Sequence, residues 1–94
     1  MIRGWGDAAT RQLFIDGRVK GRLAAVDTER AIEALALLHA STSLASLAAL
    51  RHLRLHKLKG RLRDRWAIDL NGPWRIVFRF ENGEFHDVAI VDYH

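Results

Sequence analysis

The hydrophobic pattern of this chain changes period near Leu50, and that change constrains the fold more than any other feature. Before it, apolar side chains recur at the spacing of one helix face; after it, they alternate with polar ones, as in a half-buried strand. A chain of 94 residues has room for one hydrophobic core, so the two halves must bury their apolar faces against each other. The sequence therefore predicts one α+β domain over residues 1–94, with helices packed on one face of an antiparallel sheet.

The first half should hold a short strand and two to three helices, because residues typical of helix caps flank its apolar stripes. The expected elements are a strand at Ile2–Trp5, a helix capped by Asp7 that reaches Phe14 or Ile15 before Gly17, a second helix capped by Asp27 or Thr28, and a further short turn or helix within Ser41–Leu50.

The second half should hold four antiparallel strands, because its alternating runs are separated by turn-forming residues. The expected strands cover residues 53–58, Trp66–Leu70, Trp74–Phe80 and Phe85–Tyr93, with turns at Asn71-Gly72-Pro73 and Asn82-Gly83. In the third strand Arg75, Val77 and Arg79 alternate with an apolar row. We therefore expect that strand to have one buried face and one basic face.

Charge is distributed unevenly along the chain, whose formal net charge is +4. Residues 1–50 hold six Lys/Arg and five Asp/Glu, residues 51–79 hold nine and two, and residues 80–94 hold none and four. A local excess of seven positive charges makes a polyanion the first partner to consider, since neutralised phosphates release counterions. The alternative is a solvated, charged sheet face.

Composition also narrows the setting in which the chain works. There is no cysteine, which excludes disulfides and thiolate metal sites, and nothing before Leu13 is typical of a secretion signal. The longest uncharged stretch, Ala34–Leu50, is too short and too polar for a membrane span. We expect an intracellular, cytoplasmic protein that does not bind a membrane.

No nucleotide-binding, nucleophile-elbow or metalloprotease motif is present, and the five histidines are not spaced as a metal site. We expect no metal and no cofactor. The remaining candidates for acid, base and electrostatic work are Lys59, Arg75 and the terminal Asp92-Tyr93-His94. RNA needs no metal to be cut when its own 2′-hydroxyl attacks the adjacent phosphate, and His, Lys and Arg are the side chains that such a route requires. Taken singly, each candidate has a simpler explanation as solvated surface or a frayed end.

An ordered set of short motifs resembles the HigB branch of the RelE toxin superfamily. The motifs are Met1-Ile2-Arg3, Leu13-Phe14 with Gly17-Arg18-Val19, Ala40-Ser41-Thr42-Ser43-Leu44, Leu58-Lys59-Gly60, Trp74-Arg75-Ile76 and Val91-Asp92-Tyr93-His94. The resemblance covers nearly the whole chain, and the combination of LKG, WRI and a terminal DYH is specific where each alone is weak.

This resemblance implies a RelE-like fold and a toxin of a type II toxin–antitoxin system. The implied activity is a ribosome-dependent endoribonuclease that cuts messenger RNA and inhibits translation. The implied partners are a HigA-like helix-turn-helix antitoxin, messenger RNA on the ribosome, and operator DNA indirectly through the antitoxin.

The resemblance also implies residue roles. Lys59 and Arg75 resemble phosphate-stabilising residues, His94 resembles a proton-transfer residue, and Tyr93 would support or orient the scissile nucleotide. The expected RNA-binding side chains are Arg61, Arg63, Arg65 and Arg79.

One departure from the family pattern leaves two alternatives open. Many relatives carry an arginine in the segment before WRI, where this chain has Asp69 and Asn71. The protein could then be a catalytically weak relative that binds RNA or co-represses its operon. A second alternative is a gyrase inhibitor of the ParE type, without nuclease activity, although the DYH ending speaks against it.

Overall fold

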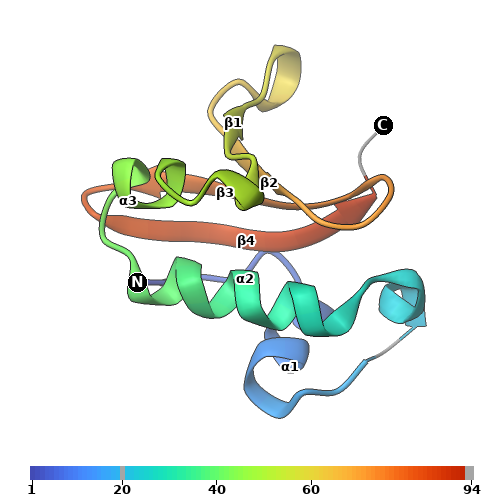
Figure 1. The fold of residues 1–94 in the computed structure, drawn as a ribbon. Coiled ribbons are helices and arrows are strands. Elements are labelled where there is room, and N and C mark those ends of the chain that lie inside the picture. The colour runs from blue at the N-terminus through green and yellow to red at the C-terminus, as the bar shows by residue number, and fades with distance from the viewer. Residues whose placement is uncertain (20, 93–94) are drawn as a thin grey trace.

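The computed structural model describes residues 1–19 and 21–92 (Figure 1). Its helices are α1 (Ala8–Asp16), α2 (Thr28–Ala40) and α3 (Leu44–Ala48), with short 3₁₀ turns η1 (Gly21–Ala25), η2 (Arg51–Leu53) and η3 (Gly60–Leu62). Its strands are β1 (His56–Lys57), β2 (Trp66–Asp69), β3 (Trp74–Glu81) and β4 (Glu84–Asp92).

The four strands form one antiparallel sheet in the order β1-β2-β3-β4, and α1 and α2 cover one of its faces (Figure 1). The main core lies between these layers, where Leu13 and Leu35 from the helices join Ile76, Phe78 and Ile90 from the sheet. All five are fully buried, and burial of each such side chain contributes roughly 1.5–3 kcal/mol. The predicted α+β class is therefore confirmed.

Helix α1 has the predicted N-cap, extends to Asp16, one residue beyond the predicted end, and is fixed to the sheet by a buried hydroxyl. Asp7 is its N-cap and accepts a hydrogen bond from the backbone N–H of Thr10 at 2.7 Å. Gly17 ends the helix with φ 67°, a left-handed conformation that glycine adopts without strain. The fully buried Thr10 hydroxyl accepts a hydrogen bond at 2.9 Å from the backbone N–H of Ile90 in β4.

The predicted cap Asp27 also sets the start of α2, where it accepts from the backbone N–H of Arg30. The predicted further helix is α3, and the structure shows that Ser43 caps it. The predicted Asn82-Gly83 hairpin connects β3 and β4, with φ values of 52° and 78°. Positive φ at both central residues is the requirement of a type I′ turn.

The predicted N-terminal strand is reduced to two isolated parallel bridges with β4, from Ile2 to Phe85 and from Trp5 to Val88. The reason is a bulge in β4, where an extra residue lies between the partners of Val77 and Arg79. Asp87 adopts φ 54° there, as the first residue of such a bulge can. The kink interrupts the ladder that the N-terminal segment would otherwise extend.

The predicted strand at residues 53–58 is wrong over most of its length. Arg51–Leu53 form a 3₁₀ turn, Arg54 has φ 53°, and only His56–Lys57 are extended as β1. A left-handed residue at position 54 reverses the chain, so the segment cannot run straight along the sheet.

Candidate functional site

We call the sheet face opposite the helices the open face. It carries a second, smaller apolar cluster. Leu58, Ala67 and Val77 are buried there, with Leu62 and Val91 packed against them. The chain between β1 and β2, which contains η3, folds over this face because Leu62 anchors it to the cluster. Arg75 and Val77 lie on the open face, while Ile76 and Phe78 lie in the main core, as the alternation predicted.

A groove of about 320 Å³ crosses the open face. It is lined by Gly6, Leu62, Arg65, Val77, Asp87, Ala89 and Val91. Its volume lies at the lower end of the range for small-molecule sites, and most of its lining is apolar. Gly6 matters to its wall, since a Cβ at that position would lie 2.9 Å from the backbone oxygen of Asp87.

Asp69 is the centre of a charged cluster at one end of the open face. Its carboxylate lies 2.7 Å from Nε of Arg75, 3.2 Å from Nε of Arg54 and 3.8 Å from Nδ1 of His56. The Arg75 contact is an ion pair without hydrogen-bond alignment, because Asp69 Oδ1 is buried and has no aligned donor among the described residues. We call these four residues the Asp69 cluster.

Arg75 is held in place by more than this carboxylate. Its Nη1 donates to the backbone oxygens of Gly72 and Trp74, both at 2.9 Å, and its side chain is 23% exposed. A guanidinium with this many contacts has lost most of its freedom before any ligand arrives. The departure from the family pattern at Asp69 thus has a physical consequence, which is to fix Arg75.

The other departure, Asn71, has a structural role. Its side chain accepts from the backbone N–H of Asp27 at 2.7 Å and donates to the backbone oxygen of Ala25 at 3.1 Å. It therefore links the β2–β3 turn to the start of α2.

A second charged cluster lies at the groove itself, and we call it the Asp87 cluster. Asp87 Oδ2 accepts hydrogen bonds from Arg79 Nε at 2.7 Å and Arg65 Nη1 at 3.0 Å. These bonds, that from Arg79 first, lower the pKa of Asp87 from its ordinary value, and the same bond raises the pKa of Arg79. Two of the predicted RNA-binding side chains are therefore already paired with an acid.

The other predicted cations of this segment are unpaired within the described residues. Lys59 precedes η3 and is exposed, and Arg61 and Arg63 are exposed on the same loop. The backbone N–H of Leu58, the residue before Lys59, donates to the backbone oxygen of Arg65, whereas Arg75 pairs with Asp69 across β2 and β3. Arg65 and Asp69 are four residues apart, so Lys59 and Arg75 are separated by roughly 13 Å along the strand direction. The phosphate-stabilising roles of Lys59 and Arg75 stay a prediction, and contact of both residues with one phosphate depends on the reach of their side chains.

The predicted catalytic residues Tyr93 and His94 lie outside the described residues. What the structure gives is the end of β4, where Val91 lies opposite Arg75 and Asp92 lies opposite Trp74. The described part of β4 therefore ends beside Arg75, at the same end of the sheet as the Asp69 cluster.

His56 was not among the predicted site residues and belongs to this cluster. It is exposed on β1, and its Nδ1 lies 2.8 Å from the backbone oxygen of Arg54. A carbonyl can only accept, so Nδ1 carries the hydrogen and a neutral ring has its lone pair on Nε2. Its position three residues before Lys59 of the LKG motif was the available signal in the sequence.

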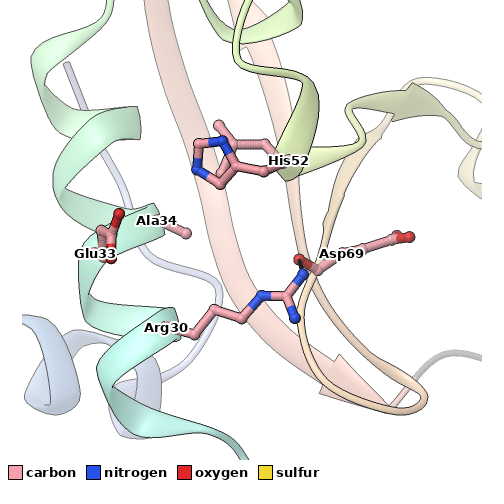
Figure 2. Close-up of a pocket in the computed structure, with 6 residues that line it drawn as sticks. Arg30, Glu33, Ala34, His52 and Asp69 are labelled. Carbon is pink, nitrogen blue, oxygen red and sulfur yellow. Dashed lines mark hydrogen bonds between the residues drawn. The ribbon is translucent and has the colours of Figure 1, made fainter.

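A second, smaller pocket lies between α2, η2 and the end of β2 (Figure 2). It is lined by Arg30, Glu33, Ala34, His52, Leu53 and Asp69. Its volume of about 40 Å³ suits one or two water molecules and no larger ligand.

Within residues 1–19 and 21–92, no group of three or more His, Asp or Glu side chains lies close enough together to hold a metal ion. Over the same residues, no helix is both long and apolar enough to cross a membrane.

A small α+β protein whose open sheet face carries arginine clusters and an exposed basic loop has the surface chemistry that polyanion-binding proteins use. Comparison with known proteins is more specific. Residues 4–94 match the model of the HigB-like toxins, described as RelE-like toxins of the type II toxin–antitoxin system HigB. The chain belongs to this family, as its motifs predicted, and an antitoxin is accordingly its partner. A protein named Endoribonuclease HigB, from Proteus vulgaris, is 31% identical over 94 residues that cover all of both chains.

Proposed function

We propose that this toxin is a cytoplasmic endoribonuclease that cuts messenger RNA on the ribosome and thereby inhibits translation. The observation that carries the proposal is the open face, where a groove adjoins two arginine clusters and an exposed basic loop. The full-length similarity to a protein named Endoribonuclease HigB supports the same activity. Membership of the HigB branch favours it over gyrase inhibition of the ParE type.

The chemistry needs no cofactor. A base removes the 2′-hydroxyl proton, the 2′-oxygen attacks phosphorus, the bond to the 5′-oxygen breaks, and an acid protonates that leaving oxygen. His56 has its Nε2 lone pair available as a base, and His94 is the candidate acid. Arg75, fixed by Asp69, and Lys59 would hold the charge that develops on the phosphorane. Each of these groups typically contributes factors of about 10²–10³.

The partners follow from the same assignment. We propose a HigA-like antitoxin with a helix-turn-helix, through which the pair contacts its operator DNA. Tyr93 would orient the scissile nucleotide, and Arg61, Arg63, Arg65 and Arg79 would contact the RNA backbone.

The experiment uses purified protein with translating ribosomes, and it reads messenger RNA fragments. His94→Gln and His56→Gln should each reduce the cleavage rate by roughly 10²-fold or more. His52→Gln is the matched control, because His52 is exposed on η2 and, unlike His56, forms no ion pair with the Asp69 carboxylate in the described part of the chain. Absence of fragments with the wild type, together with inhibition of gyrase supercoiling, would replace this proposal by the ParE-type alternative.

RNA binding to ribosomes or oligonucleotides without any cleavage would instead support the catalytically weak relative. A His94→Gln protein that cleaves at the wild-type rate would remove His94 from the mechanism.

A further inference from the structure

The groove on the open face is built for something other than a phosphate. Leu62, Val77, Ala89 and Val91 make its lining mostly apolar, whereas a phosphate is bound by cations and N–H groups. Its polar groups, Arg65 and Asp87, belong to the Asp87 cluster. A flat ligand with an apolar surface and a polar edge fits this distribution.

Charge complementarity identifies the occupant. The Asp69 cluster brings two arginines to one end of the open face, the Asp87 cluster brings two to the groove, and Arg61 and Arg63 stand on the loop that forms its wall. A single-stranded RNA that follows these cations would pass its bases over the apolar lining between them. An unpaired base that covers this aliphatic lining removes apolar surface from water, whichever base it is.

Asp87 gives this groove a means of discrimination. Both arginines bind its Oδ2, and its side chain remains 47% exposed. The arginines keep the carboxylate ionised, so Oδ1 can accept hydrogen bonds and cannot donate them. Its complement on a base edge is an exocyclic amino group, which adenine, cytosine and guanine carry and which uracil lacks.

We propose that the groove holds one unpaired base of the RNA and that Asp87 Oδ1 accepts a hydrogen bond from the exocyclic amino group of that base. This inference rests on the proposed function and names the part of the RNA that the open face recognises. Asp87 is then a specificity-determining residue, while the chemistry takes place at the Asp69 end.

Occupancy of the groove is tested by methyl NMR on the purified toxin. The probe is a tetranucleotide of adenosine with 2′-O-methyl riboses, which cannot be cleaved by 2′-oxygen attack. The methyl signals of Leu62, Val77 and Val91 should shift on titration, and those of the exposed Ile15 and Val19 should not. If the groove methyls do not shift at millimolar RNA, the proposal is overturned.

The role of Asp87 is tested with a second tetranucleotide in which purine riboside replaces adenosine, so that only the amino group is lost. The wild type should bind the adenosine probe roughly tenfold more tightly, as expected for one hydrogen bond to a charged group. Asp87→Ala should bind both probes equally. A merely structural role would change both affinities and leave their ratio intact, so an unchanged ratio in Asp87→Ala would overturn the assignment.

The matched control is Asp64→Ala, which removes the same charge from the same region. Asp64 is exposed, pairs with Arg65 at 3.6 Å and does not line the groove. Its probe ratio should equal that of the wild type. Because these readouts need no cleavage, they are independent of the proposed nuclease activity, which the ribosome assay judges separately.

Discussion

At the scale of single residues, two aspartates decide how the cations of the open face behave. Asp69 and Asp87 each contact two arginines, so four of the positive charges are oriented and partly neutralised before RNA binds. Such pairing weakens the net electrostatic attraction of these arginines for a polyanion, but it fixes the orientation of each guanidinium. In the proposed mechanism, a fixed Arg75 would stabilise the transition state better than a mobile one.

Arg75→Ala should lower the single-turnover cleavage rate on saturated ribosomes by roughly 10²-fold or more, while RNA binding weakens much less. The reason is that the phosphorane carries more negative charge than the bound substrate. Arg54→Ala is the control, because Arg54 contacts the same carboxylate but its side chain is 74% exposed, and its rate should stay within a few-fold. Equal rates for Arg75→Ala and the wild type would exclude Arg75 from catalysis.

Asp87 should also make stability depend on pH. Its pKa in the folded state lies below the ordinary 3.8, so its ion pairs stabilise the protein above that pH and are lost as pH falls through the folded value. The melting temperatures of the wild type and Asp87→Asn should therefore differ at neutral pH and converge in strong acid. A difference that persists in strong acid would mean that the carboxylate charge is not its source.

At the scale of elements, β4 organises the molecule. It pairs with β3 along its length, receives the N-terminal segment at its bulge, and accepts α1 through Thr10. The bulge also places Asp87 where it meets both Arg65 and Arg79. A substitution that distorts β4 should therefore disturb both the packing of α1 on the sheet and the shape of the groove.

Thr10→Val should destabilise the protein by about 1–3 kcal/mol in urea unfolding. The change keeps the side chain's shape but leaves the buried backbone N–H of Ile90 without its acceptor. Thr42→Val, at an exposed loop position, should change stability by less than about 0.5 kcal/mol. An equally small effect at Thr10 would show that water or another group replaces the lost bond.

At the scale of the whole molecule, folding redistributes the charge seen in the sequence. The basic segment 51–79 and the acidic segment 80–94 meet in the sheet, where Asp87 offsets two arginines. The cations that remain unpaired in the described part of this segment include Lys59, Arg61 and Arg63, all on the loop over the open face. This loop should therefore dominate long-range attraction of RNA.

Binding of RNA or ribosomes should weaken steeply with salt, by roughly 0.7–0.9 in log affinity per log salt for each phosphate neutralised. Arg61→Ala with Arg63→Ala should reduce that slope more than Arg65→Ala alone, since Arg65 is already paired with Asp87. The slope is measured by titration at several salt concentrations. A slope that the double variant leaves unchanged would place the loop against another partner, such as the antitoxin.

The sequence by itself determined the elements, because caps, turns and hydrophobic periods act over a few residues. Asp7, Asp27 and Asn82-Gly83 set boundaries wherever they stand, and the alternation in β3 placed Arg75 on the face opposite the core. The same reasoning failed at Arg54 and at the N-terminal strand, where a left-handed residue and a bulge interrupt patterns that look regular.

Only the tertiary structure decided which charged groups meet. Asp69 with Arg54 and Asp87 with Arg65 are 15 and 22 residues apart, and ion pairing at that separation depends on strand register and on the bulge, which no local signal encodes. Strand register likewise placed His56 in the Asp69 cluster. The sequence therefore predicted which cations make up the basic face. Only the fold showed which of them are held by an aspartate and which remain unpaired among the described residues.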